Sequence, residues 1–472
     1  MGFKKNLIKK LVIIFIICLP FFTLLFWGQN SCVKANSQDV YENLETFSNV
    51  LHLLETNYVE DIDTKKVIEG AIKGMLSSLD PHSSYMKPEQ YKELKIETKG
   101  SFSGIGIEIT LKDGILTVVS PIEGTPAYKQ GLQAQDKILK INGELTKDLS
   151  LMEAVKKLRG PKGSEVTISI HREGLNELKE ITIVRDVIPL TSVKSKMIEP
   201  GYGYIRIRNF QAKTTKEFKE GLKELEEKTP LKGLLIDVRS NPGGLLDQAI
   251  KISDIFLDKG MIVSTKGRLE DQNMEFEAHK NGNKYSFPIV VLVNEGSASA
   301  SEIIAGALQD HKRAIILGTK TFGKGSVQTV IPMKNGAALR LTTARYYTPD
   351  GTSIQATGIT PDINVPSITL SPESLQGGGN ATMKFLREKD LRHHFSNGEN
   401  EKDSEKKTDE KETGDETDSE VENRSETDTD NEEKSTEQEK DKDGFDEIMK
   451  KDYQLQQALL LLKGINVFSK MQ

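Results

Sequence analysis

Apolar residues between positions 38 and 95 recur every three or four residues, which is the period of an α-helix. Two such runs are present, and Leu79-Asp80-Pro81 closes the second. The recurring positions are Val40, Leu44, Phe47, Val50, Leu51 and Leu54 in the first run, and Ile68, Ile72 and Met75 in the second. We therefore expect a helical N-terminal domain over residues 36–96, or an arm that pairs two copies of the chain.

The pattern changes to short strand-like runs between positions 97 and 186. Turn signals such as Lys112-Asp113-Gly114 and Asn142-Gly143 separate the apolar stretches. The predicted strands cover residues 105–111, 115–119, 138–141, 166–171 and 178–184, and two short helices cover 125–131 and 151–158. Residues 97–186 are therefore expected to form a small β-rich domain.

Strands and helices alternate over residues 187–370, the largest segment of the chain. The strands are expected at 202–207, 231–238, 289–293, 314–317, 327–331 and 338–346, and the helices at 216–227, 245–257 and 301–308. Such alternation favours helices packed on a sheet. We expect an α+β multidomain protein whose α/β core, residues 187–370, carries the chemistry.

Residues 396–444 contain 21 acidic and 8 basic residues, and Val421 is their only apolar residue. This stretch cannot bury enough apolar surface to offset its chain entropy, so we expect a disordered insertion. A connector over 371–395, with a helix near 383–394, precedes it. An apolar run over 445–462 follows it and predicts that the end of the chain, 445–472, is a helix packed against the core. The remaining 423 residues carry a net charge of −6 + 13 = +7, which is too diffuse to indicate nucleic-acid binding.

The first 35 residues have the pattern of an export signal. Lysines at positions 4, 5, 9 and 10 precede a 17-residue apolar run, 11–27, and Val33-Lys34-Ala35 offers a small-residue cleavage site. A cleaved signal peptide and a retained membrane anchor both fit, because the run is short for a membrane span and Pro20 interrupts it. In either case the rest of the chain is expected outside the cytoplasm.

Composition narrows the class of protein. With 36% hydrophobic and 28% charged residues, the chain is neither collagen-like nor a multi-span membrane protein. The two cysteines, Cys18 and Cys32, lie in or beside the apolar run, so a disulfide scaffold and a thiolate nucleophile are both excluded from the rest of the chain. No His, Asp and Glu cluster has metal-binding spacing, and neither a metal nor a cofactor is expected.

Small residues follow the predicted strand 289–293 in the segment Asn294-Glu295-Gly296-Ser297-Ala298-Ser299-Ala300-Ser301-Glu302. A strand-to-helix turn of this kind exposes a side chain and leaves free amides at the helix start, which suits a developing oxyanion. Serines that cap the helix account for this segment equally well. His311 lies about three turns beyond Ser299 on the same helix, so a serine nucleophile here would need a different base.

A lysine stands between glycines in Thr321-Phe322-Gly323-Lys324-Gly325-Ser326, and with Gly318 it nearly matches a phosphate-binding loop. A glycine occupies the position of the magnesium-binding hydroxyl, and a strand follows in place of a helix, which argues against a nucleotide. A lysine of this kind acts as a base if burial lowers its pKa. A solvated lysine in a glycine turn is the simple alternative. A third segment, 237–245, is a strand end, a Gly243-Gly244 turn and a helix start.

Together these segments resemble the carboxyl-terminal processing (tail-specific) proteases, which are exported serine proteases with a serine–lysine dyad and an embedded PDZ domain. The resemblance covers about residues 40–370 and the terminal helix. It rests on Leu79-Asp80-Pro81-His82-Ser83, Gly104-Ile105-Gly106, Gly124-Thr125-Pro126-Ala127, Leu158-Arg159-Gly160-Pro161-Lys162-Gly163, residues 237–245, residues 297–302, Gly323-Lys324-Gly325 and Thr348-Pro349-Asp350-Gly351. Each motif is weak by itself, and the full set in this order is very specific.

The resemblance implies Ser299 as the nucleophile, Lys324 as its base and Gln328 as a supporting residue. Lys324 and Gln328 are an even number of residues apart, so on an extended strand both side chains would face the same side. The implied oxyanion donors are the amide of Ala300 and that of either Gly243 or Gly244, between which the sequence does not decide.

For residues 97–186 the resemblance implies a PDZ domain that captures the C-terminal tails of protein substrates. The loop Ser103-Gly104-Ile105-Gly106 would aim amides at the terminal carboxylate, with Arg159 as a further contact, and the tail would pair as an added strand. Gln135 replaces the glycine usual before Asp136, from which we expect a local change of turn. The chain is thus expected to be an exported endopeptidase, and the sequence does not decide between a monomer and a homodimer. The alternative is a catalytically silent PDZ scaffold at the cell surface.

Overall fold

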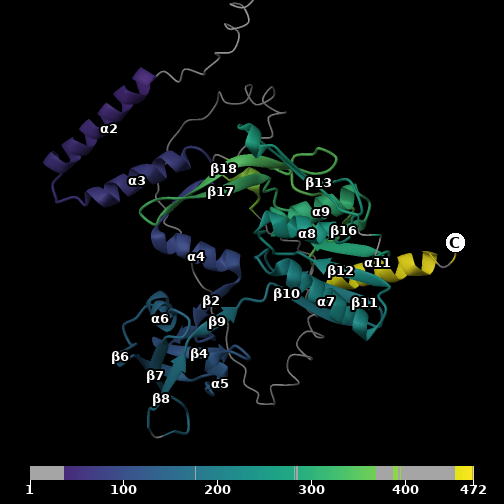
Figure 1. Ribbon diagram of the computed structural model, residues 1–472, viewed down its shortest axis with the longest axis horizontal. Coiled ribbons are helices and arrows are strands. Elements are labelled where there is room, and N and C mark those ends of the chain that lie inside the picture. Colours follow the sequence, from purple (N-terminus) through teal and green to yellow (C-terminus); the bar gives the residue numbers. More distant parts are fainter. Residues whose placement is uncertain are drawn as a thin grey trace, which may run out of the picture. The chain divides into compact units, whose positions relative to one another are not determined.

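The computed structural model describes residues 37–175, 177–280, 282, 285–367, 386–391, 394, 452–469 and 471 (Figure 1). The predicted signal or anchor (1–35) and the acidic insertion (396–444) lie outside these residues, as does most of the connector. The chain divides into two compact units, residues 1–72 and 73–472. Within the described part, none of the helices combines the length and apolar character needed to cross a membrane.

The helical spacing near the N-terminus is confirmed by α2 (Ser37–Asn57) and α3 (Thr64–Ser77). The apolar residues of α2 remain open to solvent: Leu44, Phe47 and Val50 are 57%, 45% and 51% exposed. The structure differs from the expectation of an all-helical segment over 36–96 at β1 (Ser84–Met86), which precedes α4 (Pro88–Lys99) and pairs with a strand of the core. Three residues are too few to show a period of two, so β1 could not be predicted from the hydrophobic pattern.

The β-rich domain is a six-stranded antiparallel sheet in the order β3-β4-β5-β7-β8, with β6 added to β5. Its core contains Val118, Ile138 and Ile168, which are fully buried. The helix α6 begins with a capping box, because the Ser150 hydroxyl accepts from the Glu153 amide and the Glu153 carboxylate accepts from the Ser150 amide. The elements are β3 (Ile107–Lys112), β4 (Ile115–Pro121), α5 (Pro126–Lys129), β5 (Lys137–Ile141), β6 (Glu144–Leu145), α6 (Leu151–Leu158), β7 (Glu165–His171) and β8 (Lys179–Val184), and the ribbon β2 (Ser101–Gly104) with β9 (Asp186–Pro189) leads into and out of the domain.

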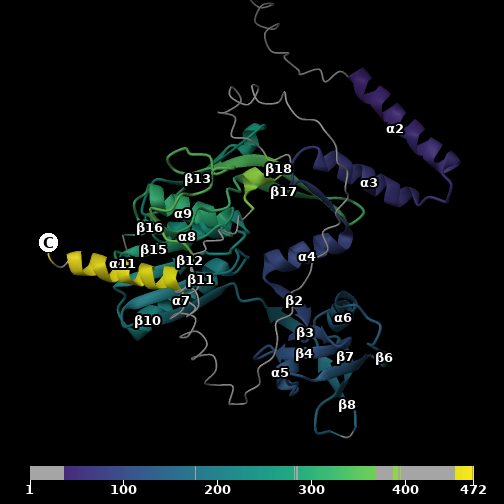
Figure 2. The ribbon, with the colours of Figure 1, turned by 180° about the vertical axis from the view of Figure 1, so that it is seen from behind.

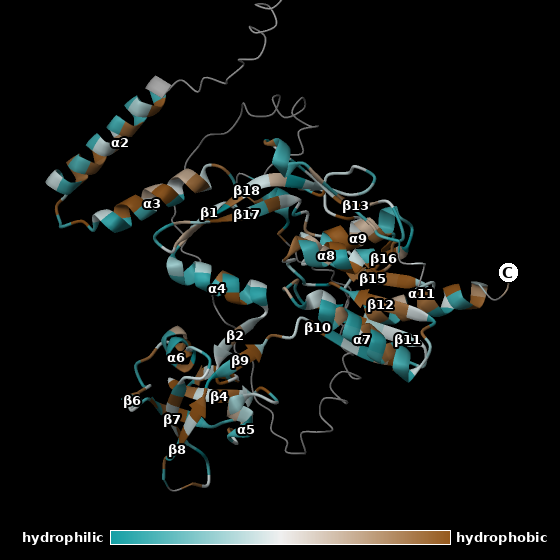
Figure 3. Cartoon of the chain, viewed as in Figure 1, coloured by the Kyte–Doolittle hydropathy of each residue, from teal (hydrophilic) through white to brown (hydrophobic). Residues whose placement is uncertain are grey.

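The core is built on a second six-stranded sheet, in the order β10-β11-β12-β15-β16-β19, which is parallel except for β10. Strands β12 and β15 are buried on both faces and are mostly hydrophobic in Figure 3, apart from Asp237 at the end of β12. Such strands need cover on both sides. The bounds are β10 (Val193–Glu199), β11 (Tyr202–Ile207), α7 (Thr214–Lys228), β12 (Gly233–Asp237), α8 (Leu246–Asp254), β15 (Ile289–Val293), α9 (Ala300–Asp310), β16 (Ala314–Gly318) and β19 (Ile363–Asn364).

Two layers of helices cover this sheet. On one face α7, α8 and α9 pack against alternate strand residues such as Leu234 and Ile236. On the other face the terminal helix α11 (Tyr453–Ser469) packs against Leu235 and its neighbours through Leu455, Ala458 and Leu462 (Figure 2). The predicted packing of the terminal helix is therefore confirmed within the described residues, where the helix covers Tyr453–Ser469.

A separate antiparallel sheet, β1-β18-β13-β14 with β17 on β18, completes the core. Its strands are β13 (Met261–Gly267), β14 (Met274–Glu277), β17 (Ser326–Pro332) and β18 (Ala338–Tyr347), and a 3₁₀ turn η1 (Glu270–Gln272) joins β13 to β14. In the described part of the connector the predicted helix over 383–394 is wrong: residues 386–391 form only a 3₁₀ turn, η2 (Glu388–Asp390). Glu388 contacts Phe322 and Gln355 of the core in place of helical packing.

Candidate active site

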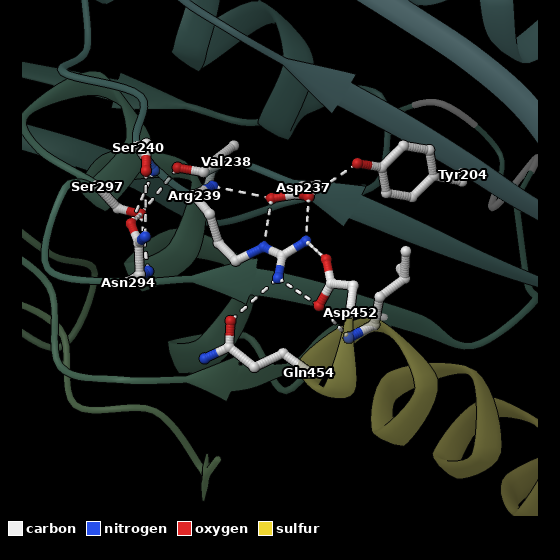
Figure 4. Close-up of polar contacts among 10 residues, drawn as sticks. Tyr204, Asp237, Val238, Arg239, Ser240, Asn294, Ser297, Asp452 and Gln454 are labelled. Atoms are coloured by element: carbon white, nitrogen blue, oxygen red, sulfur yellow. Dashed lines mark hydrogen bonds and ion pairs between the residues drawn. The ribbon is translucent and has the colours of Figure 1, made fainter. Parts of the chain in front are cut away.

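Three serines at the junction of β15 and α9 have different environments. The Ser297 hydroxyl donates to the Val238 carbonyl at 2.8 Å and accepts from the Asn294 amide at 3.0 Å (Figure 4). The Ser301 hydroxyl donates to the Asn241 carbonyl at 2.9 Å. Both serines are fully buried. They tie the end of β15 and the start of α9 to the turn that follows β12.

Ser299, between them, has a free hydroxyl. It is half-buried, and its side chain neither caps α9 nor bonds another described residue. Its backbone has φ 54° and ψ −113°, a conformation that L-residues other than glycine rarely adopt. Strain of this kind, at a strand-to-helix turn that projects a hydroxyl, is a feature of nucleophile sites. Capping therefore does not account for this serine.

A fully buried carboxylate, that of Glu302, joins the serine segment to the lysine segment. Its Oε2 accepts from the amides of Ser299 at 2.7 Å and Lys324 at 2.9 Å. Its Oε1 accepts from the Thr321 hydroxyl at 2.6 Å and the Gly323 amide at 2.8 Å. Burial raises the pKa of Glu302 to about 7, against the opposing effect of these four hydrogen bonds. Our sequence analysis missed Glu302, although a glutamate three residues after a serine at a helix start is a capping signature.

Lys324 lies in the loop between β16 and β17, and its backbone is fixed by its glycine neighbours. A Cβ on Gly325 would lie 2.2 Å from the Gln355 nitrogen, so no other residue fits there. Burial lowers the pKa of Lys324, and the nearby Arg340 lowers it further, whereas Glu388, Glu302 and Asp80 act in the opposite direction. The predicted depression of the lysine pKa by burial is thus confirmed in direction.

Gln328 does not orient the lysine in the way the sequence suggested. Its amide donates to the Ser326 hydroxyl at 2.8 Å and to the Thr342 hydroxyl at 3.5 Å. Lys324 precedes β17, and a bulge lies between Val327 and Gln328, so the even spacing on one strand does not apply. Among the described residues, no hydrogen bond joins the Lys324 amine to Ser299 or to Gln328.

The glycine turn after β12 lies against the nucleophile segment. A Cβ on Gly243 would be 2.9 Å from the Ser299 Cβ and 3.1 Å from the Ala300 nitrogen, and Gly243 has a φ of +102°. The Gly243 amide already donates to the Asn241 side chain at 2.9 Å. Within the described chain the Gly244 amide has no acceptor, and the amide of Ala300, the first residue of α9, has no helical partner. Gly243 is the glycine shown close to Ser299, but the availability of its amide favours Gly244 as the second donor.

An ion-pair cluster fixes the end of β12, which leads into the same turn (Figure 4). The Arg239 guanidinium bonds both carboxylate oxygens of Asp237, at 3.0 and 2.7 Å, and both of Asp452, at 2.9 and 2.7 Å. It also donates to Gln454 at 3.0 Å. Asp237 in turn accepts from the Tyr204 hydroxyl at 2.8 Å. The residues just before α11 thus hold the β12 end that leads into the glycine turn.

The predicted carboxylate-binding loop of the β-rich domain leaves two amides available. Those of Ile105 and Gly106, between β2 and β3, donate to no other described residue. Arg159 lies over the Phe102 ring at 4.6 Å and pairs with Glu93 at 2.7 Å. Gln135, at the position where glycine is usual, has a left-handed φ of 69°.

No metal site accompanies these groups: in the described residues, no three His, Cys, Asp or Glu side chains are arranged to hold an ion. A serine with a free hydroxyl, a partly desolvated lysine tied to it through one carboxylate, and two amides without acceptors instead suit acyl transfer.

Comparison with known proteins agrees with this geometry. Residues 201–365 match Peptidase family S41, residues 117–172 match a PDZ domain, and residues 28–90 match the N-terminal domain of the activating protease CtpB. The chain is 48% identical over 376 residues to a carboxy-terminal-processing protease of Bartonella bacilliformis, covering 79% of this chain and 85% of the relative. It is 38% identical to the carboxy-terminal processing protease CtpA of Bacillus subtilis, covering 72% and 73%.

Among solved structures, the photosystem II D1 C-terminal processing protease is 32% identical, with a TM-score of 0.40, covering 68% of this chain and 86% of the other. The sequence matches carry the assignment. The chain belongs to peptidase family S41 and is a carboxy-terminal processing serine protease with a PDZ domain.

Proposed function

We propose that Ser299 and Lys324 form a catalytic dyad that makes this protein an endopeptidase. The observation that carries the proposal is the contrast among the three serines: Ser297 and Ser301 are bonded and buried, whereas Ser299 has a free hydroxyl on a strained backbone. Glu302 then connects the Ser299 amide to the Lys324 amide.

Neutral Lys324 removes the Ser299 proton as the serine Oγ attacks the peptide carbonyl carbon. The developing oxyanion accepts hydrogen bonds from the Ala300 and Gly244 amides. The Lys324 ammonium then protonates the leaving amine as the C–N bond breaks, which leaves an ester on Ser299. Water attacks the ester carbon and its proton passes to Lys324; the bond between the acyl carbon and Ser299 Oγ then breaks, and the Lys324 ammonium returns the proton to Oγ, which releases the carboxylic acid product and restores the serine and the neutral lysine. Gln328 supports the loop of the base through Ser326 instead of contacting the amine.

The substrates proposed are proteins presented by their C-terminal tails. The amides of Ile105 and Gly106 suit a terminal carboxylate, and a tail residue would pair along the adjacent strand. Arg159, held by Glu93 and Phe102, lies beside Gly104, whose Cβ position is 3.7 Å from the Arg159 Cγ. Ser103 and Gly104 shape this loop through their pairing in β2 and β9.

The proposal also includes export of the protein and the pairing of two copies of the chain. The lysines and apolar run of residues 1–35 support a location outside the cytoplasm, as a secreted or an anchored protein. The exposed apolar residues of α2 suit a homodimer contact. N-terminal sequencing of protein recovered from intact cells separates the two fates: a chain that begins at Asn36 is cleaved, and one that retains residues 1–35 is anchored.

The first test is cleavage of an unfolded protein by the purified enzyme and by Ser299→Ala, with Ser297→Ala and Ser301→Ala as matched controls. Ser299→Ala and Lys324→Ala are expected to lower the rate by about 10³-fold or more. Both should still bind a tail peptide. Cleavage that survives in Ser299→Ala, or is lost equally in all three serine variants, contradicts the assignment. Tail binding without cleavage in the parent protein would favour the silent scaffold.

A further inference from the structure

A pair formed by the half-buried His82 and the buried Glu388 lies beside the lysine loop, and both residues come from segments outside the expected core. Glu388, in η2, is fully buried even though its neighbours Lys389 and Asp390 are exposed. Its carboxylate contacts the His82 Nε2 at 2.7 and 2.8 Å and accepts from the Gln355 amide at 2.8 Å. In the sequence, His82 belongs to the motif at residues 79–83 and Glu388 to the connector, residues 371–395.

Two contacts fix Glu388 on either side of Lys324. Its backbone amide donates to the Phe322 carbonyl at 3.3 Å, two residues before the lysine. The Gln355 side chain that donates to the Glu388 carboxylate also accepts from the Gly325 amide at 3.0 Å, one residue after the lysine. The carboxylate is therefore held against the lysine loop from both ends.

Four charged groups act on the Lys324 amine: Arg340 from β18, Glu302 from α9, Asp80 from the segment before β1, and Glu388 from η2. Glu302 and Asp80 accept hydrogen bonds from amides and hydroxyls, as in the bonds from His82 N and Ser83 N to Asp80, both at 2.8 Å. Glu388 differs because it comes from the connector and because its carboxylate contacts the His82 ring.

We propose that Glu388 is a positioning residue of the connector that holds Lys324 as an ammonium ion in the resting enzyme and so restrains the base. A buried anion beside an amine favours the protonated amine, whereas attack by Ser299 requires the neutral one. The inference rests on the proposed roles of Ser299 and Lys324. It makes the connector, immediately before the acidic insertion, part of the control of catalysis.

The test compares the full-length protein with Glu388→Gln, which keeps the shape and removes the charge. Without the anion, Lys324 loses its proton at lower pH, so the rising limb of kcat/KM should move down by about one pH unit or more, which is a roughly tenfold gain on that limb. At high pH the two rates should converge. Asp390→Asn, in the same turn but exposed, is the matched control and should leave the profile unchanged.

A second readout does not depend on peptidase activity. In a Ser299→Ala background, the pH dependence of Lys324 acylation by acetic anhydride, followed by peptide mass spectrometry, reports the lysine protonation directly. Glu388→Gln should lower the midpoint of labelling, and Glu388→Asp, which keeps the anion but draws it away from the lysine, should lower it less. An unchanged midpoint in a folded Glu388→Gln protein overturns the inference.

The two readouts distinguish a failure of this inference from a failure of the proposed Ser299–Lys324 dyad. A labelling shift with no matching shift of kcat/KM overturns the control of catalysis by Glu388. An inactive parent with shifted labelling rejects the proposed dyad and leaves the charge effect of Glu388 on Lys324 standing. If Glu388→Gln does not fold, the labelling midpoint of Glu388→Asp decides: a shift toward lower pH supports the inference, since the shorter side chain draws the anion away, and a shift toward higher pH contradicts it.

Discussion

Two buried polar clusters flank the serine turn, and their charges are balanced differently. Around Arg239, one cation is shared by the carboxylates of Asp237 and Asp452. Around Glu302, one carboxylate accepts four hydrogen bonds from neutral donors and has no cation bonded to it in the described chain. The first cluster joins α11 to the end of β12, and the second joins the serine to the lysine loop.

The difference in charge balance sets a difference in pH response. The Arg239 guanidinium holds the pKa of Asp452 below its usual value, and the two carboxylates raise the pKa of Arg239, so this pair stays ionised through the neutral range. Burial raises the pKa of Glu302 to about 7. A fold can therefore keep its scaffold contacts insensitive to pH while the carboxylate at its active site titrates near neutrality.

The largest effect is expected from Arg239→Met. It leaves Asp237, which is fully buried, and Asp452 without their cation, and breaking a buried pair in this way costs about 3–5 kcal/mol of unfolding free energy. Urea unfolding of the parent and the variant measures this loss. The triple variant with Asp237→Asn and Asp452→Asn removes the stranded charges and should recover much of it. A loss below about 1 kcal/mol would mean that the cluster does not anchor α11.

The next largest effect concerns Glu302 and the pH dependence of stability. Because the folded pKa of about 7 lies above the ordinary value of 4.5, the folded state keeps a proton that the unfolded state releases between these pH values. The contribution of Glu302 to stability, about 3 kcal/mol, is therefore complete below pH 4.5 and is lost as the pH rises through 7.

This slope is measured as the difference between parent and Glu302→Gln in urea unfolding at several pH values. The variant, which has no titrating group there, should lack the slope between pH 4.5 and 7 and run parallel to the parent in the flat regions on either side. Parallel curves for the two proteins would place the Glu302 pKa near its ordinary value and remove the contrast with the Arg239 cluster.

Much of the architecture was predictable because long periodic segments carry it. Strands 202–207 and 289–293 and the helix 151–158 match β11, β15 and α6 residue for residue. The contacts that complete the site were not predictable, because they join residues far apart in the chain. The choice between Gly243 and Gly244 depends on the Asn241 side chain. The position of Gln328 depends on a β-bulge, and the environment of Lys324 depends on Glu388. Spacing along one segment does not contain such information.

Smaller effects are expected from the serines that link the two clusters. Ser297→Ala strands the buried Val238 carbonyl and Asn294 amide, and Ser301→Ala removes a donor to the Asn241 carbonyl, so each should cost about 1–3 kcal/mol. Ser299→Ala removes no hydrogen bond between described residues and should change stability by less than about 0.5 kcal/mol. Thermal unfolding beside peptide cleavage measures both quantities. A stability loss in Ser299→Ala equal to its neighbours' would make it a third structural serine.

The smallest effect tests whether a strained backbone by itself marks function. Gln135 and Ser299 both have positive φ, 69° and 54°, yet the Gln135 strain lies in a turn of the β-rich domain where the resemblance implies no catalytic role. A left-handed residue other than glycine costs about 1–2 kcal/mol, partly offset by the greater freedom of glycine in the unfolded chain. Gln135→Gly should therefore stabilise the protein by about 0.5–1 kcal/mol and leave cleavage unchanged. Ser299→Gly should gain a similar amount and abolish cleavage. Equal activity in the two variants would show that strain at Ser299 is as incidental as strain at Gln135.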